Sequence, residues 1–291
     1  MATPRQWLEG ARPRTLPAAV APVAAGTGAA GAVDALDPGR SLLALLVAVA
    51  LQIGVNYAND YSDGVRGTDA ERTGPLRLVG SGLATPSAVR SAALGSFGLA
   101  AVTGLVLAAL TTWWLLLVGA AAIVAAWFYT GGSRPYGYRG LGEVSVFVFF
   151  GLVATVGTTY VQAERVTATS VLLGVGCGAF ACAILVANNL RDLHGDRGAG
   201  KVTLAVRLGD RRTRWLYVAL MATPYVVLVP VIVWHPAAFV AVVTAGAAFL
   251  AARKVVRGAR GRDLVTVLKE TGQTLLAYGL LLLVALTWLP D

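Results

Sequence analysis

Residues 42–69 read LLALLVAVALQIGVNYANDYSDGVRGTD, an apolar run that ends in a cluster of amide and carboxylate side chains. The run is of membrane length, since a bilayer core needs about 20 apolar residues per helix. Asn56, Asp60 and Asp63 stand at i, i+4 and i+7, so they share one face if the helix continues through them. Such oxygen ligands suit Mg²⁺, which commonly binds one or two carboxylates together with substrate phosphates. Taken alone, the stretch is equally consistent with a helix end that bears solvated acids and turns at Gly64.

A second stretch of the same kind, NNLRDLHGDRGAGK at residues 188–201, closes another long apolar run. Asn188, Asp192 and Asp196 stand there at i, i+4 and i+8. Glycine and basic residues follow in both stretches. Because ionisable groups at membrane spans are functional by default, the two motifs predict two halves of one polyanion site bridged by metal.

The composition predicts an all-α polytopic membrane protein. The chain has 291 residues, of which 56% are apolar and 13% charged, whereas soluble domains average about 25% charged residues. No polar linker divides it, so residues 1–291 are expected to form one transmembrane domain, with residues 1–14 as an interfacial segment and not a secretory signal. The rule of about 20 apolar residues per helix predicts nine spans. They are approximately 15–33, 41–61, 88–110, 112–130, 143–163, 168–190, 214–234, 236–256 and 270–289.

The basic residues predict the orientation of these spans. If the N-terminus is cytoplasmic, all of the 24 Lys and Arg residues except Arg40 and Arg165 fall on the cytoplasmic side. This orientation places both Asn/Asp motifs on the same face. The net charge of +9 lies in short loops between spans, which indicates anionic ligands or lipid headgroups and no nucleic acid.

Arg66, Arg72 and Arg77 alternate with glycines in the loop 62–87. Glycine lets a backbone approach a ligand closely, and arginine makes bidentate contacts to phosphate. The same residues would also suit a flexible basic loop at an anionic membrane surface. Lys201, after the second motif, is a further phosphate partner, although the nucleotide-binding pattern Gly-x-x-x-x-Gly-Lys-Ser/Thr is absent.

The loop 129–143, YTGGSRPYGYRGLGE, contains three tyrosines. Interfacial tyrosines usually form an aromatic belt, but here their π faces could also stabilise a cation. Glu143 begins a span, where it either complements the helix dipole or faces the cavity.

Cysteine and histidine offer no further site. Cys177 and Cys182 lie within one predicted span without metal-type spacing, so both are interpreted as small buried side chains. His194 is interpreted as a solvated loop residue, and His235, beside Pro236, as structural.

These motifs resemble the UbiA superfamily of intramembrane prenyltransferases along most of the chain, from residues 11–19 to 206–209. The segments that carry the resemblance are 59–63 with 67–69, 74–77, 129–132, 140–143, 188–192 with Asp196, and 200–204. Gly195 stands before Asp196 where the ubiquinone branch usually has tyrosine, which favours the naphthoate branch. The C-terminal spans match only in hydrophobicity.

The resemblance implies helices around a central cavity in a bacterial plasma membrane, with Mg²⁺ as cofactor. It also implies a polyprenyl diphosphate donor and an aromatic acid acceptor. The implied reaction transfers the polyprenyl group to 1,4-dihydroxy-2-naphthoate with loss of CO₂ and diphosphate, giving demethylmenaquinol in menaquinone biosynthesis.

The site residues follow from the motifs and the resemblance together. The expected catalytic residues are Asp60, Asp63, Asp192 and Asp196. The expected metal ligands are Asn56, Asp60, Asp63, Asp69, Asn188, Asp192 and Asp196. The expected diphosphate contacts are Asn59, Arg66, Arg72, Arg77 and Lys201. The side chains expected to line the acceptor and the allylic cation are Tyr61, Tyr129, Tyr138, Glu143 and Asn189.

Other functions remain open at this point. Within the enzymes, the acceptor could instead be homogentisate, a 4-hydroxybenzoate or chlorophyllide. An ion-coupled transporter would also carry acidic residues, although transporters commonly place them near the bilayer midplane. A purely structural membrane protein would not explain two matched Asn/Asp stretches.

Overall fold

The computed structural model describes residues 2–67 and 76–289, and within them the chain is helical, without a strand. The α-helices are α1 (Pro4–Gly10), α2 (Pro17–Gly31), α3 (Pro38–Arg66), α4 (Pro86–Leu110), α5 (Leu115–Phe128), α6 (Gly142–Val146), α7 (Ala154–Ala163), α8 (Ala168–Gly198), α9 (Leu204–Trp234), α10 (Ala245–Val256) and α11 (Arg262–Trp288). The 3₁₀ segments are η1 (Pro13–Thr15), η2 (Tyr136–Arg139) and η4 (Pro236–Thr244), and η3 (Phe147–Val153) is a π-helical segment between α6 and α7.

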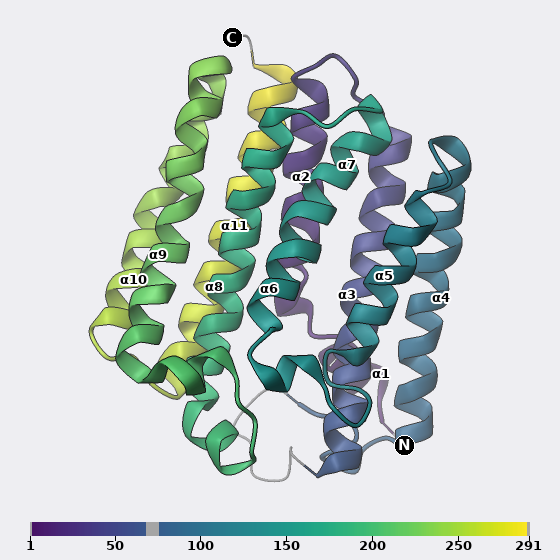
Figure 1. Cartoon of the computed structure of the whole chain (residues 1–291), viewed down its shortest axis with the longest axis vertical. Helices are drawn as coiled ribbons and strands as arrows, with labels where there is room; N and C mark the ends of the chain where they lie inside the picture. Colours follow the sequence, from purple (N-terminus) through teal and green to yellow (C-terminus); the bar gives the residue numbers. More distant parts are fainter. Residues whose placement is uncertain (1, 68–75, 290–291) are drawn as a thin grey trace.

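Among the described residues, seven helical segments are long and apolar enough to cross a membrane. They are α3, α4, Gly142–Ala163, α8, α9, Pro236–Val256 and α11. At 14 and 15 residues, α5 and α2 are shorter than a full span, but they occupy two of the predicted positions and run beside the longer helices (Figure 1). The predicted multi-pass helical architecture is confirmed. Seven of the nine predicted spans are helices long and apolar enough to cross a membrane, and the other two correspond to the shorter α2 and α5.

The helix boundaries follow from local capping. Asp37 and Thr85 cap α3 and α4 with side-chain oxygens that accept from backbone N–H groups, and proline follows each of them. Gly67 ends α3 with φ of 72°, a left-handed conformation that glycine adopts without strain. Gly209, with φ of 75°, divides α9, so the part of α9 that follows it begins close to the predicted start at residue 214.

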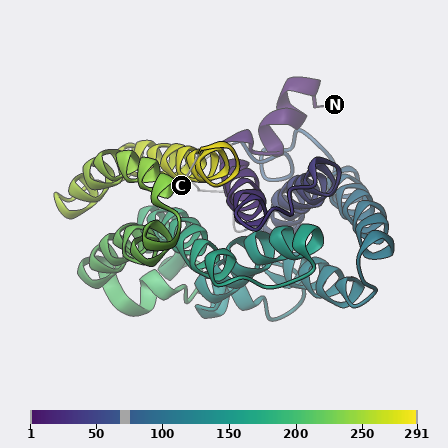
Figure 2. The same cartoon turned by 90° about the horizontal axis from the view of Figure 1, so that it is seen from above.

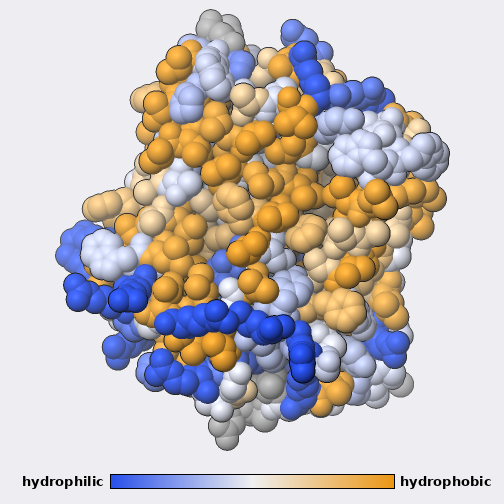
Figure 3. Space-filling model, viewed as in Figure 1, coloured by the Kyte–Doolittle hydropathy of each residue, from blue (hydrophilic) through white to orange (hydrophobic). Residues whose placement is uncertain are grey.

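Viewed from one end, the helices lie in two facing rows (Figure 2). The rows contain α11, α2 and α3 on one side and α7, α8 and α9 on the other, with α1 outside. The larger hydrophobic core joins α2, α8, α9 and α11, and a second core joins α1, α3 and α4. The N- and C-termini lie at opposite ends of the bundle (Figure 1). Figure 3 shows an apolar face across the middle, with hydrophilic residues gathered toward both ends, as a bilayer-spanning protein requires.

Candidate functional site

A cavity of about 480 Å³ lies between the helices, within the usual size range of ligand pockets. Most of its wall is apolar, with Val47, Leu51, Leu107, Leu115 and Phe149 among the lining residues. Polar and charged side chains also line it. They include Arg12, Arg14, Asn59, Asp63, Arg77, Asn188, Arg191, Asp196 and Lys201.

Asp63 forms the centre of the charged part of the cavity. It is 2% exposed, and the Tyr138 hydroxyl donates to its Oδ1 at 2.5 Å. Its Oδ2 lies 3.7 Å from an Arg77 guanidinium nitrogen and 3.9 Å from Lys201 Nζ. These partners compensate the burial of the carboxylate, which would be strongly unfavourable if it were unpaired.

Lys201 and Tyr138 join the second motif to the first. Lys201 Nζ lies 4.4 Å above the Tyr138 ring, and the Lys201 backbone N–H donates to the Asp196 carbonyl at 2.8 Å. The N–H of Val202 donates to the Tyr138 carbonyl at 2.9 Å, which fixes the chain after α8 beside the loop that carries Tyr138. Asn188 and Asp196 line the same cavity as Asn59 and Asp63, so the fold brings the two motifs together.

Arg191 is a cavity residue to which the sequence patterns assigned no role. It donates to both carboxylate oxygens of Asp192, at 2.7 and 2.8 Å, and to Asn188 Oδ1 at 2.8 Å. Arg191 lines the cavity, whereas Asp192 lies beside it.

Asp60 lies away from the cavity although it was predicted to be a metal ligand. It is 0% exposed, and its two oxygens accept from the backbone N–H groups of Leu78, at 2.7 Å, and Val79, at 3.1 Å. Successive helical residues are about 100° apart, so Asn59 and Asp63 share the cavity face of α3 while Asp60 points elsewhere. In this structure Asp60 holds the segment that carries Arg77.

Two other predicted residues of the first motif are used in local contacts. Asn56 lines the cavity, but its amide nitrogen donates to the Ala11 carbonyl and to Thr15 Oγ1, both at 2.9 Å. Arg66 is exposed and donates to the carbonyls of Thr130 and Gly132. It therefore braces the loop that follows α5 and is not among the cavity-lining residues.

The loop after α5 is further fixed by Asn59 and by tyrosines. Asn59 Oδ1 accepts from the Thr130 hydroxyl at 2.7 Å. Tyr129 lines the cavity and contacts Tyr136 edge to face, with ring centroids 5.5 Å apart. The Tyr136 hydroxyl donates to the Ala125 carbonyl at 2.7 Å, and burial raises the pKa of this hydroxyl.

The remaining predicted residues differ in their access to the cavity. Tyr61 packs against Trp127, with ring centroids 6.2 Å apart, and does not line the cavity. Glu143 also lies off the cavity, and its carboxylate accepts from the Asn189 amide at 3.0 Å, while Asn189 itself is a lining residue. Asp69 and Arg72 lie outside the described residues.

Several lining residues were not predicted to belong to the site. They are Arg12, Arg14, Thr15, Gln52, Ser145, Arg191 and Lys269. The signal for Gln52 was available, because a glutamine within an apolar run, one turn before Asn56, falls on the same helix face. Arg14 and Lys269 are distant in sequence, and only the fold brings them to one cavity.

The oxygen donors of the site are compatible with Mg²⁺. Among residues 2–67 and 76–289, no group of three or more His, Cys, Asp or Glu side chains forms a metal site by itself. Asp63 and Asp196 nevertheless line one cavity together with Asn59 and Asn188. This incomplete set fits an ion that usually takes one or two carboxylates and completes its shell with substrate phosphates and water.

The fold and site together define a polytopic helical membrane protein with a charged site in a largely apolar intramembrane cavity. Within that class, the chain belongs to the UbiA prenyltransferase family, whose model matches residues 19–268, and it is a prenyltransferase.

Curated relatives agree with this family. A Mycobacterium tuberculosis protein named 1,4-dihydroxy-2-naphthoate octaprenyltransferase is 55% identical over 280 residues, covering 96% of each chain. An Escherichia coli protein of the same name is 42% identical over 222 residues, covering 74% of this chain and 72% of its own.

Solved structures share the fold at low sequence identity. An apo UbiA homolog from Aeropyrum pernix superposes with a TM-score of 0.70 at 15% identity, covering 90% of this chain and 95% of its own. A UbiA homolog from Archaeoglobus fulgidus bound to GPP and Mg²⁺ has a TM-score of 0.65 at 14% identity, covering 96% and 99%.

Proposed function

We propose that this protein transfers a polyprenyl group from a polyprenyl diphosphate to 1,4-dihydroxy-2-naphthoate, with release of diphosphate and CO₂, to give demethylmenaquinol. The observation that carries the proposal is the contact between Asp63 of the first motif and Lys201 after the second, in a cavity that is otherwise largely apolar. The names of the relatives that are 55% and 42% identical support the naphthoate acceptor.

The charged side chains would bind the diphosphate. Arg77 and Lys201, which now contact Asp63, would turn to the incoming phosphate oxygens, and Arg191 would join them from α8. Arginine and lysine stabilise the negative charge that develops on the leaving diphosphate as the allylic C–O bond breaks.

The oxygen donors would hold Mg²⁺. Asp63, Asp196, Asn59 and Asn188 would be its ligands from the cavity face, and Asp69 and Asp192 remain predicted ligands. When bound, the metal supplies Lewis acidity toward the diphosphate oxygens, worth several kcal/mol of charge stabilisation.

The cavity walls would guide the allylic cation to the acceptor. Tyr129 and Tyr138 line the cavity, and aromatic π faces attract cations. The apolar wall would exclude water that could otherwise capture the cation. The naphthoate ring carbon that bears the carboxylate would form the new C–C bond, and its C–CO₂⁻ bond would then break, with the electron pair restoring the aromatic ring. No covalent enzyme intermediate is required.

The same proposal places the charged end of the cavity at the cytoplasmic face of a bacterial plasma membrane. The asymmetry of basic residues between the loops supports this orientation. The diphosphate would then enter from the cytoplasm while its tail lies among the apolar helices.

The test is incubation of the purified protein with a polyprenyl diphosphate and a panel of aromatic acids while diphosphate release is followed. We expect release with 1,4-dihydroxy-2-naphthoate, loss of release when EDTA removes divalent ions, and recovery on adding excess Mg²⁺. Release with 4-hydroxybenzoate or homogentisate alone would replace the proposed acceptor. The absence of release with every acid would overturn the proposal.

A further inference from the structure

Gln52 is a buried polar side chain in the apolar part of the cavity wall. It is 5% exposed and lies on α3 in the run of lining residues that continues through Asn56, Asn59 and Asp63. It precedes Asp63 by 11 positions, or about 16 Å along the helix axis. Gln52 therefore stands about three helical turns deeper along α3 than Asp63, beside Thr15, which follows the cavity-lining Arg14.

The hydrogen-bond network fixes which way the Gln52 amide points. Thr15 donates its own proton to the Arg12 carbonyl at 2.9 Å, so its hydroxyl oxygen can only accept from Gln52 and Asn56. Asn56 donates its NH₂ group to the Ala11 carbonyl, which leaves Asn56 Oδ1 facing Gln52. Both neighbours of Gln52 are thus acceptors, and its amide nitrogen must face them.

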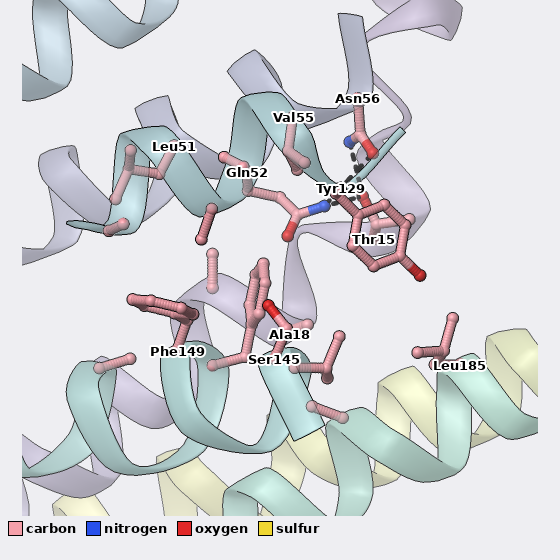
Figure 4. Close-up of a pocket in the computed structure, with 18 of the residues that line it drawn as sticks. Thr15, Ala18, Leu51, Gln52, Val55, Asn56, Tyr129, Ser145, Phe149 and Leu185 are labelled. Atoms are coloured by element: carbon pink, nitrogen blue, oxygen red, sulfur yellow. Dashed lines mark hydrogen bonds between the residues drawn. The ribbon is translucent and has the colours of Figure 1, made fainter. Parts of the chain in front are cut away.

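The Gln52 carbonyl oxygen is consequently directed into the cavity. Figure 4 shows the amide nitrogen turned to Thr15 and Asn56, and the oxygen turned to the space between α3 and the segment that carries Ser145 and Phe149. Among the described residues, nothing donates a hydrogen bond to this oxygen. An acceptor that is held rigidly in the cavity wall and has no protein donor is available to accept a hydrogen bond from a ligand.

The surroundings of this oxygen fit a flat aromatic ring. Leu51 and Val55 flank Gln52 on α3, and Phe149 stands across the cavity. An aromatic substrate ring would pack favourably against the Phe149 ring in a stacked or edge-to-face arrangement.

We infer that Gln52 Oε1 accepts a hydrogen bond from a ring hydroxyl of the aromatic substrate, which makes Gln52 a specificity-determining residue of the acceptor subsite. This inference rests on the proposed function. In 1,4-dihydroxy-2-naphthoate, the hydroxyl at position 1 bonds internally to the adjacent carboxylate, so the hydroxyl at position 4 is the free donor. Its donation to Gln52 orients the ring and enriches it in electrons, which favours attack on the allylic cation.

The experiment compares two acceptors in the full-length protein, 1,4-dihydroxy-2-naphthoate and 1-hydroxy-2-naphthoate, which lacks the hydroxyl at position 4. The ratio of their kcat/KM values measures acceptor selectivity, and it does not depend on the fraction of enzyme that is folded. Comparing the ratio between enzymes also cancels the intrinsic difference in ring reactivity.

Gln52→Met keeps the length of the side chain but removes the carbonyl. We expect kcat/KM for the dihydroxy acceptor to fall about tenfold, the size expected for one hydrogen bond. The selectivity ratio should fall by the same factor, with the KM for polyprenyl diphosphate unchanged. Thr15→Val removes the group that orients the amide and should also lower the ratio.

Gln162→Met is the matched control. Gln162 is a buried glutamine of α7 that accepts from Ser41 and Asp37 and does not line the cavity. The Gln162→Met enzyme should have the same selectivity ratio as the wild type. Wild-type selectivity in both Gln52→Met and Thr15→Val would overturn the inference, whereas failure of the wild type to use any naphthoate would overturn the proposed function instead.

Discussion

At the scale of single residues, neighbouring acids of one motif have different environments. Asp63 faces the cavity with Arg77, Lys201 and Tyr138 around it, while Asp60 is enclosed and accepts from two backbone N–H groups. A carboxylate that accepts such bonds fixes the backbone, whereas a cavity-facing carboxylate is available to a ligand. The two residues should therefore respond differently to the same substitution.

Asp63→Asn is expected to reduce turnover at least about a hundredfold, because it removes a carboxylate from the charged site. Asp60→Asn can accept with only one oxygen, so one buried N–H loses its partner, and we expect about 1–3 kcal/mol of destabilisation. Turnover and thermal unfolding of both variants check this assignment. An Asp60→Asn protein with wild-type stability and no turnover would restore Asp60 to the metal site.

At the scale of elements, close helix contacts position the wall that faces Gln52. Gly151 of η3 packs against α8 so closely that a Cβ there would lie 2.5 Å from Gly178 Cα and 2.7 Å from the Gly174 carbonyl oxygen. Small residues permit such approach between membrane helices. The neighbouring Phe149 and Phe150 of η3 line the cavity, so this contact sets the position of the aromatic wall.

Gly151→Ala is expected to destabilise the protein by about 1–3 kcal/mol, since backbone atoms must move to admit the methyl group. Turnover should fall as η3 shifts. Gly98→Ala is the matched control on α4, where a Cβ would meet nothing within 4 Å, and it should be neutral or stabilising by up to about 1 kcal/mol. Thermal unfolding in detergent measures both. Equal stability of the two variants would contradict the close packing of η3 on α8.

The opposite end of the bundle is held by Arg40. Its guanidinium donates to the Val161 carbonyl at 2.8 Å, to the Leu110 carbonyl at 3.1 Å and to Glu164 at 3.2 Å. Cations stabilise the C-terminal ends of helices, where carbonyls lack helical partners. Arg40 thus satisfies the ends of α4 and α7 from the start of α3.

Arg40→Met should lower the stability by about 1–2 kcal/mol through the loss of these bonds. Selectivity between acceptors should be unchanged, because Arg40 does not line the cavity. Arg165→Met, an exposed arginine near the same end, should leave the unfolding midpoint within experimental error. Equal midpoints for the two variants would show that Arg40 is not a structural clamp.

At the scale of the whole molecule, orientation in the membrane is the main prediction. The loops at the end of the bundle that holds Asp63 and Lys201 carry most of the basic residues, which predicts a cytoplasmic site. The two native cysteines, Cys177 and Cys182, are buried. A single introduced cysteine can therefore show on which side of the membrane its loop lies.

Ser133→Cys places a thiol on the exposed loop after α5, and Arg165→Cys places one near the opposite end. In intact cells, a membrane-impermeant maleimide should label Arg165→Cys and leave Ser133→Cys unlabelled. In inside-out vesicles the pattern should reverse. Labelling of Ser133→Cys in intact cells would place the charged site outside the cytoplasm.

Local information was sufficient for the class of protein and for the two motifs. Apolar runs of membrane length predict helices without any tertiary information, and the clustering of Asn and Asp at two helix ends predicted a shared polyanion site. The spacing could not separate Asp60 from Asp63, because a helical face defined by i, i+4 and i+7 is broad. The rotation of α3 against its neighbours decided which acid faces the cavity.

The sequence by itself determined that the chain is a multi-pass helical protein with Asn/Asp motifs at two helix ends, since both properties are encoded in short continuous segments. Only the tertiary structure decided that Lys201 meets Asp63, that Arg66 braces a loop, and that Gln52 directs a carbonyl into the cavity. These contacts join residues far apart in the chain, and they depend on how helices rotate and pack, which local spacing does not specify.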